Sequence, residues 1–288
     1  MAGWHIGIIG GSGLYDPGTL DDAQEIAVDS AFGEPSGPVI TGSLAGVRFT
    51  FLSRHGAGHR LSPSQVNYRA NVDVLKRCGV TDVLAISAVG SLREDRAPGQ
   101  FVAVDQFIDR TQGRARTFFD AGVVAHVGLA DPVCPRLSDL AAGAAEAAGA
   151  IVHRGGTYLA IEGPQFSTRA ESALYRQWGA DVIGMTAMPE ARLCREAELP
   201  YALLAMVTDY DCWRVGEAVD VATVLAVMRG NSGKARATLS HLARHLPAER
   251  APSPIDTVLD GAIITDRAHW NGRAMASLDA VCRRLLAR

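Results

Sequence analysis

The chain alternates between short runs of continuous apolar residues and longer stretches in which apolar side chains recur every three or four positions. The first pattern is typical of strands covered on both faces, and the second is typical of helices. The predicted strands are HIGIIG at the start, PVITGSL and VRFTFLS as a hairpin around Ala45-Gly46, and then VTDVLAISAVGS, FVAVDQFI, TYLAIE, DVIGM and YALLAMVT. The predicted helices are one that Ser62-Pro63 opens and Gly79 closes, followed by 137–149, 168–178, 189–199, 220–245 and 273–287.

The order of these elements predicts the fold class. Strands interleaved with helices, without a Pro/Ser-rich linker or an internal repeat, indicate one α/β domain over residues 1–288. Its central β-sheet is expected to be mixed and mostly parallel, flanked by helices, because the early hairpin adds an antiparallel pair. In such sheets ligands bind beyond the carboxyl ends of the strands, so chemistry is expected in the loops that follow the apolar runs.

Composition and charge narrow the class of protein. The 288 residues carry 28 Lys plus Arg against 31 Asp plus Glu, a net charge of -3, without the basic excess that partners of nucleic acid or anionic membranes show. The five cysteines are widely spaced and form no C-x-x-C, so we expect neither a disulfide framework nor a zinc site, and a reducing cytoplasm fits best. The N-terminus lacks the basic region of a signal peptide, and no apolar run is long enough to span a bilayer.

Two loops offer groups suited to an anion. In Gly10-Gly11-Ser12-Gly13 the glycines let backbone amides turn toward an anion, and the Ser12 hydroxyl adds a donor. A dinucleotide fingerprint or a Walker loop needs a third glycine or a lysine that is missing here, and a plain tight turn is an equal alternative. Arg54 and His55 follow the VRFTFLS strand and could bind phosphate or carboxylate, although such pairs are also common on surfaces. His59 lies four residues after His55, but no third ligand supports zinc.

Later loops offer small side chains, an aromatic face and two carboxylates. Ser87-Ala88 ends a buried strand and suits either close approach of a ligand or tight packing. Phe166 offers a flat face with the Ser167 hydroxyl beside it, or else packs at the start of a helix. Asp209 and Asp211 follow YALLAMV, and on an extended chain residues i and i+2 face the same side, which would raise the pKa of one carboxyl. That pair would protonate a leaving group near neutral pH, with a magnesium-binding pair or a solvated turn as alternatives.

Together these loops favour phosphorolysis of a nucleoside. The bond between ribose and purine breaks more easily when the base is protonated at N7 and the cationic sugar is held against an anion. The first loops supply donors for the anion, and the loop with Asp209 and Asp211 supplies an acid for the base. A dinucleotide-dependent oxidoreductase is an alternative supported only by the Gly10–Gly13 loop. A non-catalytic nucleoside-binding module is disfavoured, because both the anion donors and the two carboxylates are present.

Longer segments carry a resemblance to a known family. They are GIIGGSGLYD, SRHGAGHRLSPSQVNYRAN, AVGSLRED, DQFIDRT, IEGPQFSTRAES, GMTAMPEA and TDYDCW. The sequence resembles the methylthioadenosine phosphorylases of the trimeric purine nucleoside phosphorylase family from about residue 5 to 245, whereas 250–288 form a divergent C-terminal helical segment. The resemblance implies a nucleoside phosphorylase-like fold and a pentosyltransferase that converts 5′-methylthioadenosine and phosphate to adenine and 5-methylthioribose 1-phosphate.

The resemblance also implies roles for individual positions. Phosphate would be held by Ser12, Arg54, His55, Ser87, the amide of Ala88, and Thr186. Asp209 would accept from protonated N7 and the 6-amino group, with Asp211 helping at the amino group. The other substrate-binding residues would be Phe166 and Ser167 at the base, Met185 under the ribose, His59, Val221, Val224 and Leu225 around the 5′ substituent, and His126 from a neighbouring subunit.

The same resemblance implies a cytoplasmic homotrimer, or a dimer of trimers, that serves purine and methionine salvage. It implies no metal or organic cofactor, with inorganic phosphate as a co-substrate. Carboxylates at positions 209 and 211 favour adenine, because relatives acting on 6-oxopurines commonly carry an asparagine there that can donate to O6. A methylthioinosine or general purine nucleoside phosphorylase on the same scaffold is the alternative, and preference at the 5′ position stays open because the stretch 213–217 is one residue shorter than in animal relatives.

Overall fold

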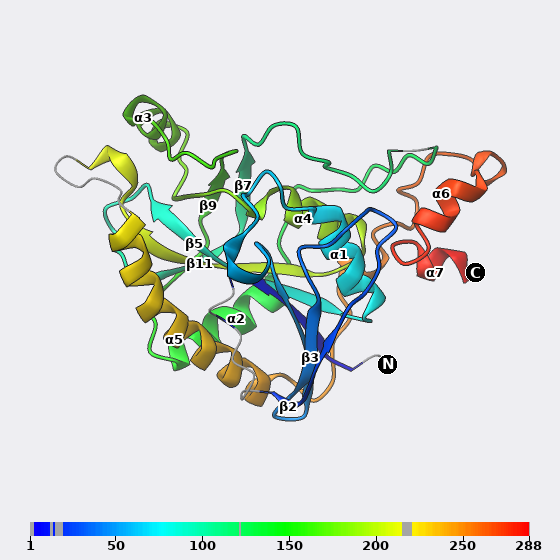
Figure 1. The fold of residues 1–288 in the computed structure, drawn as a ribbon, viewed down its shortest axis with the longest axis horizontal. Helices are drawn as coiled ribbons and strands as arrows, with labels where there is room; N and C mark the ends of the chain where they lie inside the picture. The colour runs from blue at the N-terminus through cyan, green and yellow to red at the C-terminus, as the bar shows by residue number, and fades with distance from the viewer. Residues whose placement is uncertain (1–2, 12–13, 15–19, 121, 215–220, 288) are drawn as a thin grey trace.

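A twisted, mixed β-sheet lies at the centre of the computed structural model, with helices packed on both of its faces (Figure 1). The structure describes residues 3–11, 14, 20–120, 122–214 and 221–287. The strands are β1 (His5–Gly10), β2 (Asp21–Ile26), β3 (Val39–Leu44), β4 (Val47–Ser53), β5 (Asp82–Ser91), β6 (Phe101–Val104), β7 (Gln106–Asp109), β8 (Val152–Arg154), β9 (Thr157–Ala160), β10 (Val182–Gly184) and β11 (Tyr201–Asp209).

Most neighbouring strands run parallel, as the sequence predicts. One path through the sheet has the order β2-β3-β4-β1-β5-β10-β9-β7, while β11 pairs with β5 and β6, and β6 pairs with β8. The pairs β1-β4, β1-β5, β11-β5, β10-β9, β6-β8 and β7-β9 are parallel, and the antiparallel pairs are β2-β3, β3-β4, β10-β5 and β11-β6. The carboxyl ends of β1, β4, β5 and β11 therefore meet at one edge of the sheet.

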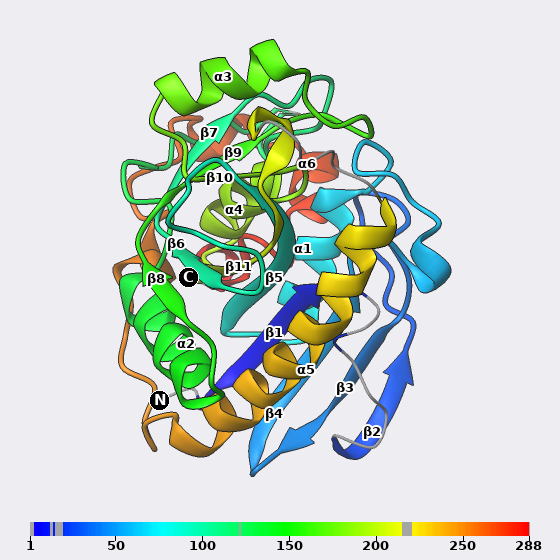
Figure 2. The same cartoon turned by 90° about the vertical axis from the view of Figure 1, so that its left-hand side faces the viewer.

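Four of the described helices cover the two faces of this sheet in pairs, and the others lie toward its ends (Figures 1 and 2). The described helices are α1 (Tyr68–Arg77), α2 (Pro135–Ala147), α3 (Arg169–Gln177), α4 (Ala187–Glu196), α5 (Val221–His245), α6 (Gly272–Ser277) and α7 (Arg283–Leu286). Alternate residues of β5 enter different cores: Leu84 and Ile86 pack with residues of α2 and α5, whereas Val83 and Ala85 pack with residues of α1 and α4. Burial on both faces explains why most of β5 is apolar.

Three of the predicted elements are wrong in their boundaries. Helix α1 begins after Asn67, whose side chain accepts from the Ala70 amide, and not at Ser62-Pro63, although Gly79 follows its end as predicted. The FVAVDQFI run is two strands, because the chain changes neighbours at Asp105. The predicted helix 273–287 is the two short helices α6 and α7, since the consecutive residues 280–282 are all buried and cannot share one face of a continuous amphipathic helix.

Two strands give no apolar signal and were not predicted. All six residues of β2 are exposed at the sheet edge, and β8 has three residues, none of them buried. The C-terminal segment joins the main core, because Leu259, Leu278 and Val281 belong to the same buried cluster as residues of α1 and α4. No helix within the described ranges combines the length and apolar character needed to cross a membrane.

Candidate active site

One cavity of about 560 Å³ lies at the carboxyl ends of the parallel strands. Loops that follow β1, β4, β9 and β11, the distal half of β5, the end of β10 and the first turns of α5 all contribute to its wall. The sequence-predicted residues that line it are Arg54, His55, His59, Ser87, Ala88, Phe166, Ser167, Met185, Thr186, Asp209, Asp211, Val224 and Leu225. The structure thus brings together residues that are up to 171 positions apart, from Arg54 to Leu225.

At the floor of the cavity, Arg54 forms a buried ion pair that the sequence did not predict. Its Nε donates to Glu190 Oε2 at 2.8 Å and its Nη2 donates to Glu190 Oε1 at 3.0 Å. The carbonyl oxygen of Ile86 accepts from Nη1, and that of Ile9 accepts from Nη2. Burial alone would lower the pKa of Arg54, but the Glu190 carboxylate raises it above its ordinary value. The guanidinium fork is therefore occupied by protein groups, whereas the sequence suggested a fork open to the ligand.

His55 is held by a backbone carbonyl on the loop after β4. Its Nδ1 lies 2.8 Å from the carbonyl oxygen of Leu61, and its ring stacks on that of His59 with centroids 4.2 Å apart. Burial lowers the pKa of His55 to about 4. The loop turns tightly here, since Gly56 has φ 71° and a Cβ on it would lie 2.8 Å from the Ser36 carbonyl oxygen. Because its pKa is about 4, the His55 ring is neutral at neutral pH.

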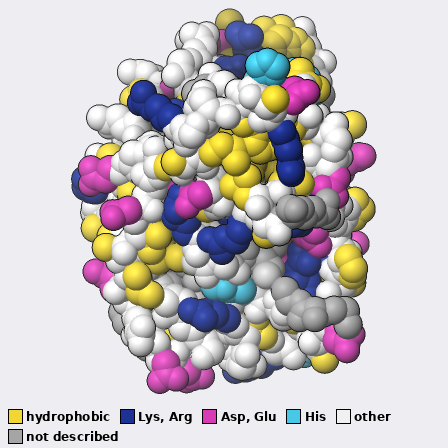
Figure 3. All heavy atoms as spheres, turned by 90° about the vertical axis from the view of Figure 1, so that its right-hand side faces the viewer, with side chains coloured by type: hydrophobic (Ala, Val, Ile, Leu, Met, Phe, Trp, Pro, Cys, Tyr) yellow, Lys and Arg dark blue, Asp and Glu magenta, His cyan; other side chains and the backbone are white. Residues whose placement is uncertain are grey.

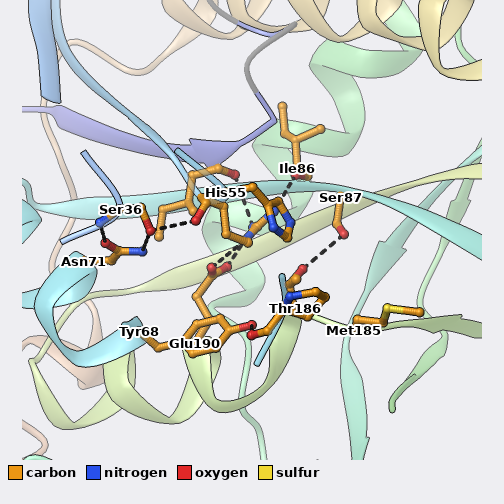
Figure 4. Close-up of polar contacts among 12 residues, drawn as sticks. Ser36, His55, Tyr68, Asn71, Ile86, Ser87, Met185, Thr186 and Glu190 are labelled. Carbon is orange, nitrogen blue, oxygen red and sulfur yellow. Dashed lines mark hydrogen bonds and ion pairs between the residues drawn. The ribbon is translucent and has the colours of Figure 1, made fainter. Parts of the chain in front are cut away.

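Two buried hydroxyls face the same end of the cavity from different strands. Ser87 Oγ of β5 lies 3.5 Å from Thr186 Oγ1, which follows β10, and Figure 4 shows the two side chains pointing toward each other near His55. Ala88 and Met185 are the neighbours of these two residues and line the cavity with them. This arrangement supplies hydroxyl donors at the end where Arg54 and His55 lie, which we call the anion end.

The carboxylates of Asp209 and Asp211 lie beside Gly90, three residues beyond Ser87 along β5, and so away from the anion end. They reach this position by a turn that differs from the predicted extended chain. Strand β11 ends at Asp209, and Asp211 has φ 52° and starts a short 3-10 helix, so the two are not residues i and i+2 of an extended chain. The amide of Asp211 donates to Asp209 Oδ1 at 2.8 Å, and this bond turns the chain. Gly90 permits the turn, because a Cβ there would lie 3.0 Å from Asp209 Oδ1.

Burial controls the ionisation of both carboxyl groups. It raises the pKa of Asp209, although the hydrogen bond from Thr208 Oγ1 at 2.7 Å and that from the Asp211 amide oppose this. Burial also raises the pKa of Asp211, whose Oδ2 has no hydrogen-bond partner among the described residues. The sequence attributed such a rise mainly to the repulsion of like charges, whereas burial is the larger cause here. We call this the acid end of the cavity.

The wall between the two ends is largely apolar. Phe166 is 48% exposed at the cavity, and Ser167 Oγ beside it has no hydrogen-bond partner within the described chain. Val224 and Leu225 of α5 line the other side, together with Met228, which the sequence analysis did not single out. A flat apolar ring therefore fits between an anion at one end and a carboxyl group at the other.

The remaining three predicted residues are Ser12, Val221 and His126. Ser12 and the side chain of Val221 lie outside the described residues. His126 is exposed, and its amide donates to the Ala262 carbonyl, so it lies with the C-terminal segment instead of the cavity. Among the described residues no group of three or more His, Cys, Asp or Glu side chains could hold a metal ion.

Comparison with known proteins identifies the class to which this fold and site belong. The family model of the phosphorylase superfamily matches residues 5–244, which is most of the chain. The chain therefore belongs to the phosphorylase superfamily. This membership removes the oxidoreductase alternative, which depended on the Gly10–Gly13 loop alone.

Individual relatives narrow the class further. S-methyl-5′-thioadenosine phosphorylase of Cereibacter sphaeroides is 54% identical and that of Bradyrhizobium diazoefficiens is 53% identical, each over 98% of both chains. A crystal structure of methylthioadenosine phosphorylase from an antarctic soil metagenomic library superposes with a TM-score of 0.92 at 43% identity, over 97% of this chain and 99% of that one. The methylthioadenosine phosphorylase of Schistosoma mansoni in complex with adenine gives a TM-score of 0.84 at 36% identity, over 90% of this chain and 99% of that one.

Proposed function

We propose that this enzyme catalyses the phosphorolysis of 5′-methylthioadenosine to adenine and 5-methylthioribose 1-phosphate. The observation that carries the proposal is the polarity of its cavity, which has anion donors at one end and carboxyl groups with raised pKa at the other. The bond from C1′ to N9 breaks, a bond from C1′ to a phosphate oxygen forms, and the purine leaves as a neutral base. The charges that develop in this reaction match the two ends of the cavity.

Asp209 is the proposed acid at the purine. Burial raises the pKa of Asp209, which favours the protonated form that can donate to N7 of the departing base. Once the proton has moved, the carboxylate accepts the hydrogen bond from N7. Asp211 also lines the cavity and would accept from the 6-amino group. Two acceptors suit adenine better than a 6-oxopurine, whose O6 needs a donor.

Phosphate would bind at the anion end. Ser87 and Thr186 supply hydroxyls, and the amide of Ala88 and the Ser12 hydroxyl complete the proposed set. Arg54 contributes chiefly as the floor of this end, because Glu190 and two carbonyls already occupy most of its N–H groups. Phe166 and Ser167 would contact the base, Met185 the ribose, and His59, Val221, Val224 and Leu225 the 5′ substituent. This chemistry needs only a proton and an anion, so the proposal includes no metal or organic cofactor.

The proposed active form is a cytoplasmic homotrimer in which His126 reaches the cavity of the neighbouring copy. His126 is exposed, and two apolar side chains near it are exposed as well, Val124 at 42% and Ile264 at 63%. Hydrophobic side chains gather on the face of the molecule that carries α6 and α7 (Figure 3). Sedimentation analysis at micromolar concentration tests the assembly, and a monomer with full activity would contradict it.

A base-release assay tests the proposed reaction. Purified enzyme is incubated with 5′-methylthioadenosine, adenosine, 5′-methylthioinosine or inosine, with and without phosphate, and the free base is measured by chromatography. We expect release of adenine from methylthioadenosine that depends on phosphate and exceeds release of hypoxanthine from either inosine-type substrate. Faster release of hypoxanthine would instead establish the purine nucleoside alternative.

A further inference from the structure

The hydrogen bond on one side of the His55 ring determines what its other side can do. Nδ1 lies 2.8 Å from the Leu61 carbonyl oxygen, and a carbonyl oxygen can only accept, so Nδ1 carries a hydrogen. In a neutral imidazole the second nitrogen then bears a lone pair and no hydrogen. His55 lines the cavity, and Nε2 is the ring nitrogen left for a ligand.

The surroundings keep this ring neutral. Burial is the largest influence and lowers the pKa of His55 to about 4, and the charge of Arg54 and the neighbouring His59 ring lower it further. The Leu61 carbonyl acts in the opposite direction without overcoming them. At neutral pH, Nε2 is therefore a hydrogen-bond acceptor.

The other described groups at the anion end are donors or are already neutralised. Ser87 and Thr186 offer hydroxyls, and the positive charge of Arg54 is balanced by Glu190 within a pair whose side chains are both 2% exposed. Figure 4 shows His55, Ser87 and Thr186 close to Glu190, the ion-pair partner of Arg54. An anion here meets several donors and one acceptor, without a net positive charge from the described groups.

We propose that the anion end selects an oxyanion that carries a proton, because His55 Nε2 accepts a hydrogen bond from the O–H of hydrogen phosphate. Sulfate has no such proton near neutral pH, so its oxygen meets the Nε2 lone pair unless His55 first takes up a proton from solvent. The inference rests on the proposed function, since it takes the anion end as the phosphate site. It adds a basis for discrimination between two anions of similar size and charge.

The size of this discrimination follows from one hydrogen bond to a charged group, which corresponds to roughly 10-fold to 100-fold in affinity. Phosphate and arsenate, which both keep a proton at about pH 8, are expected to bind at least about tenfold more tightly than sulfate. The affinity for sulfate should rise as the pH falls, because more of the protein then carries the proton on His55. Phosphate binding should not require that His55 takes up a proton.

Isothermal titration calorimetry of the full chain at about pH 8 tests the proposal. Titrations with inorganic phosphate, arsenate and sulfate in two buffers of different ionisation enthalpy give the number of protons taken up. At about pH 8 we expect phosphate and arsenate to bind at least about tenfold more tightly than sulfate, and proton uptake with sulfate to grow as the titrations are repeated at lower pH. Equal affinities for phosphate and sulfate at about pH 8 would overturn the proposal.

A variant and a control sharpen this test. His55→Gln places an amide that can donate to either anion, so the phosphate preference should shrink to within about threefold and proton uptake with sulfate should disappear. His245→Gln, on the exposed end of α5, should leave the preference unchanged. If His55→Gln does not fold, the ratio of the wild-type affinities for phosphate and sulfate decides alone. Adenine release is measured on the same sample, so a protein that shows the predicted anion preference without phosphorolysis would contradict only the proposed function.

Discussion

Arg54 and Glu190 form a bidentate ion pair beneath the cavity, with both side chains 2% exposed and the Nε to Oε2 distance at 2.8 Å. Tyr201 donates a further hydrogen bond to Glu190 Oε1 at 2.9 Å. A charge can be buried this deeply only when its partner and its hydrogen bonds are all present. The pair fixes the floor of the anion end and makes that floor electrically neutral.

Removing the charge of Glu190 should therefore be costly to stability. We expect Glu190→Gln to lower the free energy of unfolding by about 3–5 kcal/mol, because the Arg54 charge is left buried without its partner. Glu146→Gln is the matched control, since Glu146 pairs with Arg154 on the surface with both side chains more than 40% exposed. Its loss should stay within about 1 kcal/mol in the same denaturant titration. Similar losses of unfolding free energy for the two variants would show that the buried pair stabilises the fold no more than the surface pair does.

Asp209→Asn tests the acid end. We expect roughly a 100-fold to 10,000-fold loss of kcat on methylthioadenosine, the range for removal of a general acid. Some activity on inosine-type nucleosides should appear, because the new amide can donate to O6. Asp95→Asn, at an exposed position, serves as the control and should keep wild-type activity. An Asp209→Asn enzyme that turns over adenine substrates as fast as wild type would remove Asp209 from the mechanism.

Glu196 gives the structure a predictable dependence on pH. Burial raises the pKa of Glu196 to about 7, although the Phe118 amide and Thr117 Oγ1 donate to its carboxylate at 2.7 and 2.8 Å. Because the folded state then holds a proton that the unfolded state has lost, stability should fall as the pH rises from about 4.5 to 7. The loss should reach up to about 3 kcal/mol.

Unfolding of wild type and Glu196→Gln by denaturant at several pH values measures this dependence. The variant lacks the titrating carboxyl, so its stability should fall less over the same range. Parallel curves for the two proteins would show that Glu196 titrates at its ordinary pKa in the folded state.

Complementation between two defective variants tests whether copies of the chain share a site. In the proposed trimer, His126 and Asp209 of one cavity come from different subunits. Co-expression of His126→Ala with Asp209→Asn should create some cavities in which both residues are intact. Activity at low methylthioadenosine concentration should then exceed the sum of the separately prepared variants severalfold. Purely additive activity would mean that each cavity draws both residues from one chain, or that His126 has no role.

Much of the fold follows from local patterns in the sequence. Strands β1, β5 and β11 contain long apolar runs because both of their faces are covered, and such runs reveal buried strands directly. The exposed edge strand β2 has the sequence DDAQEI and gives no such signal, because its pairing with β3 depends on backbone groups. The boundary at Asp105 was also hidden, since a change of neighbouring strands leaves no local mark on the sequence.

The site was predictable where loop chemistry alone points to a ligand. Asp209 and Asp211 stood out because two carboxylates follow an apolar run, whereas the loops at Ser87 and Phe166 were equally consistent with packing; all four residues line one cavity. Glu190 did not stand out, because a glutamate near the start of a helix is usually solvated, and only the fold brings it to Arg54. The turn at Asp211 was not predicted either, because the chain was expected to stay extended after the strand.

Phosphorus NMR of the complete reaction tests the central claim most directly. Wild-type enzyme is incubated with 5′-methylthioadenosine and inorganic phosphate, and both phosphorus signals and released adenine are measured over time. The proposed reaction predicts one molecule of sugar 1-phosphate formed, and one phosphate consumed, for each adenine released. Release of adenine without consumption of phosphate would show that water is the nucleophile and would contradict the assignment of the anion end.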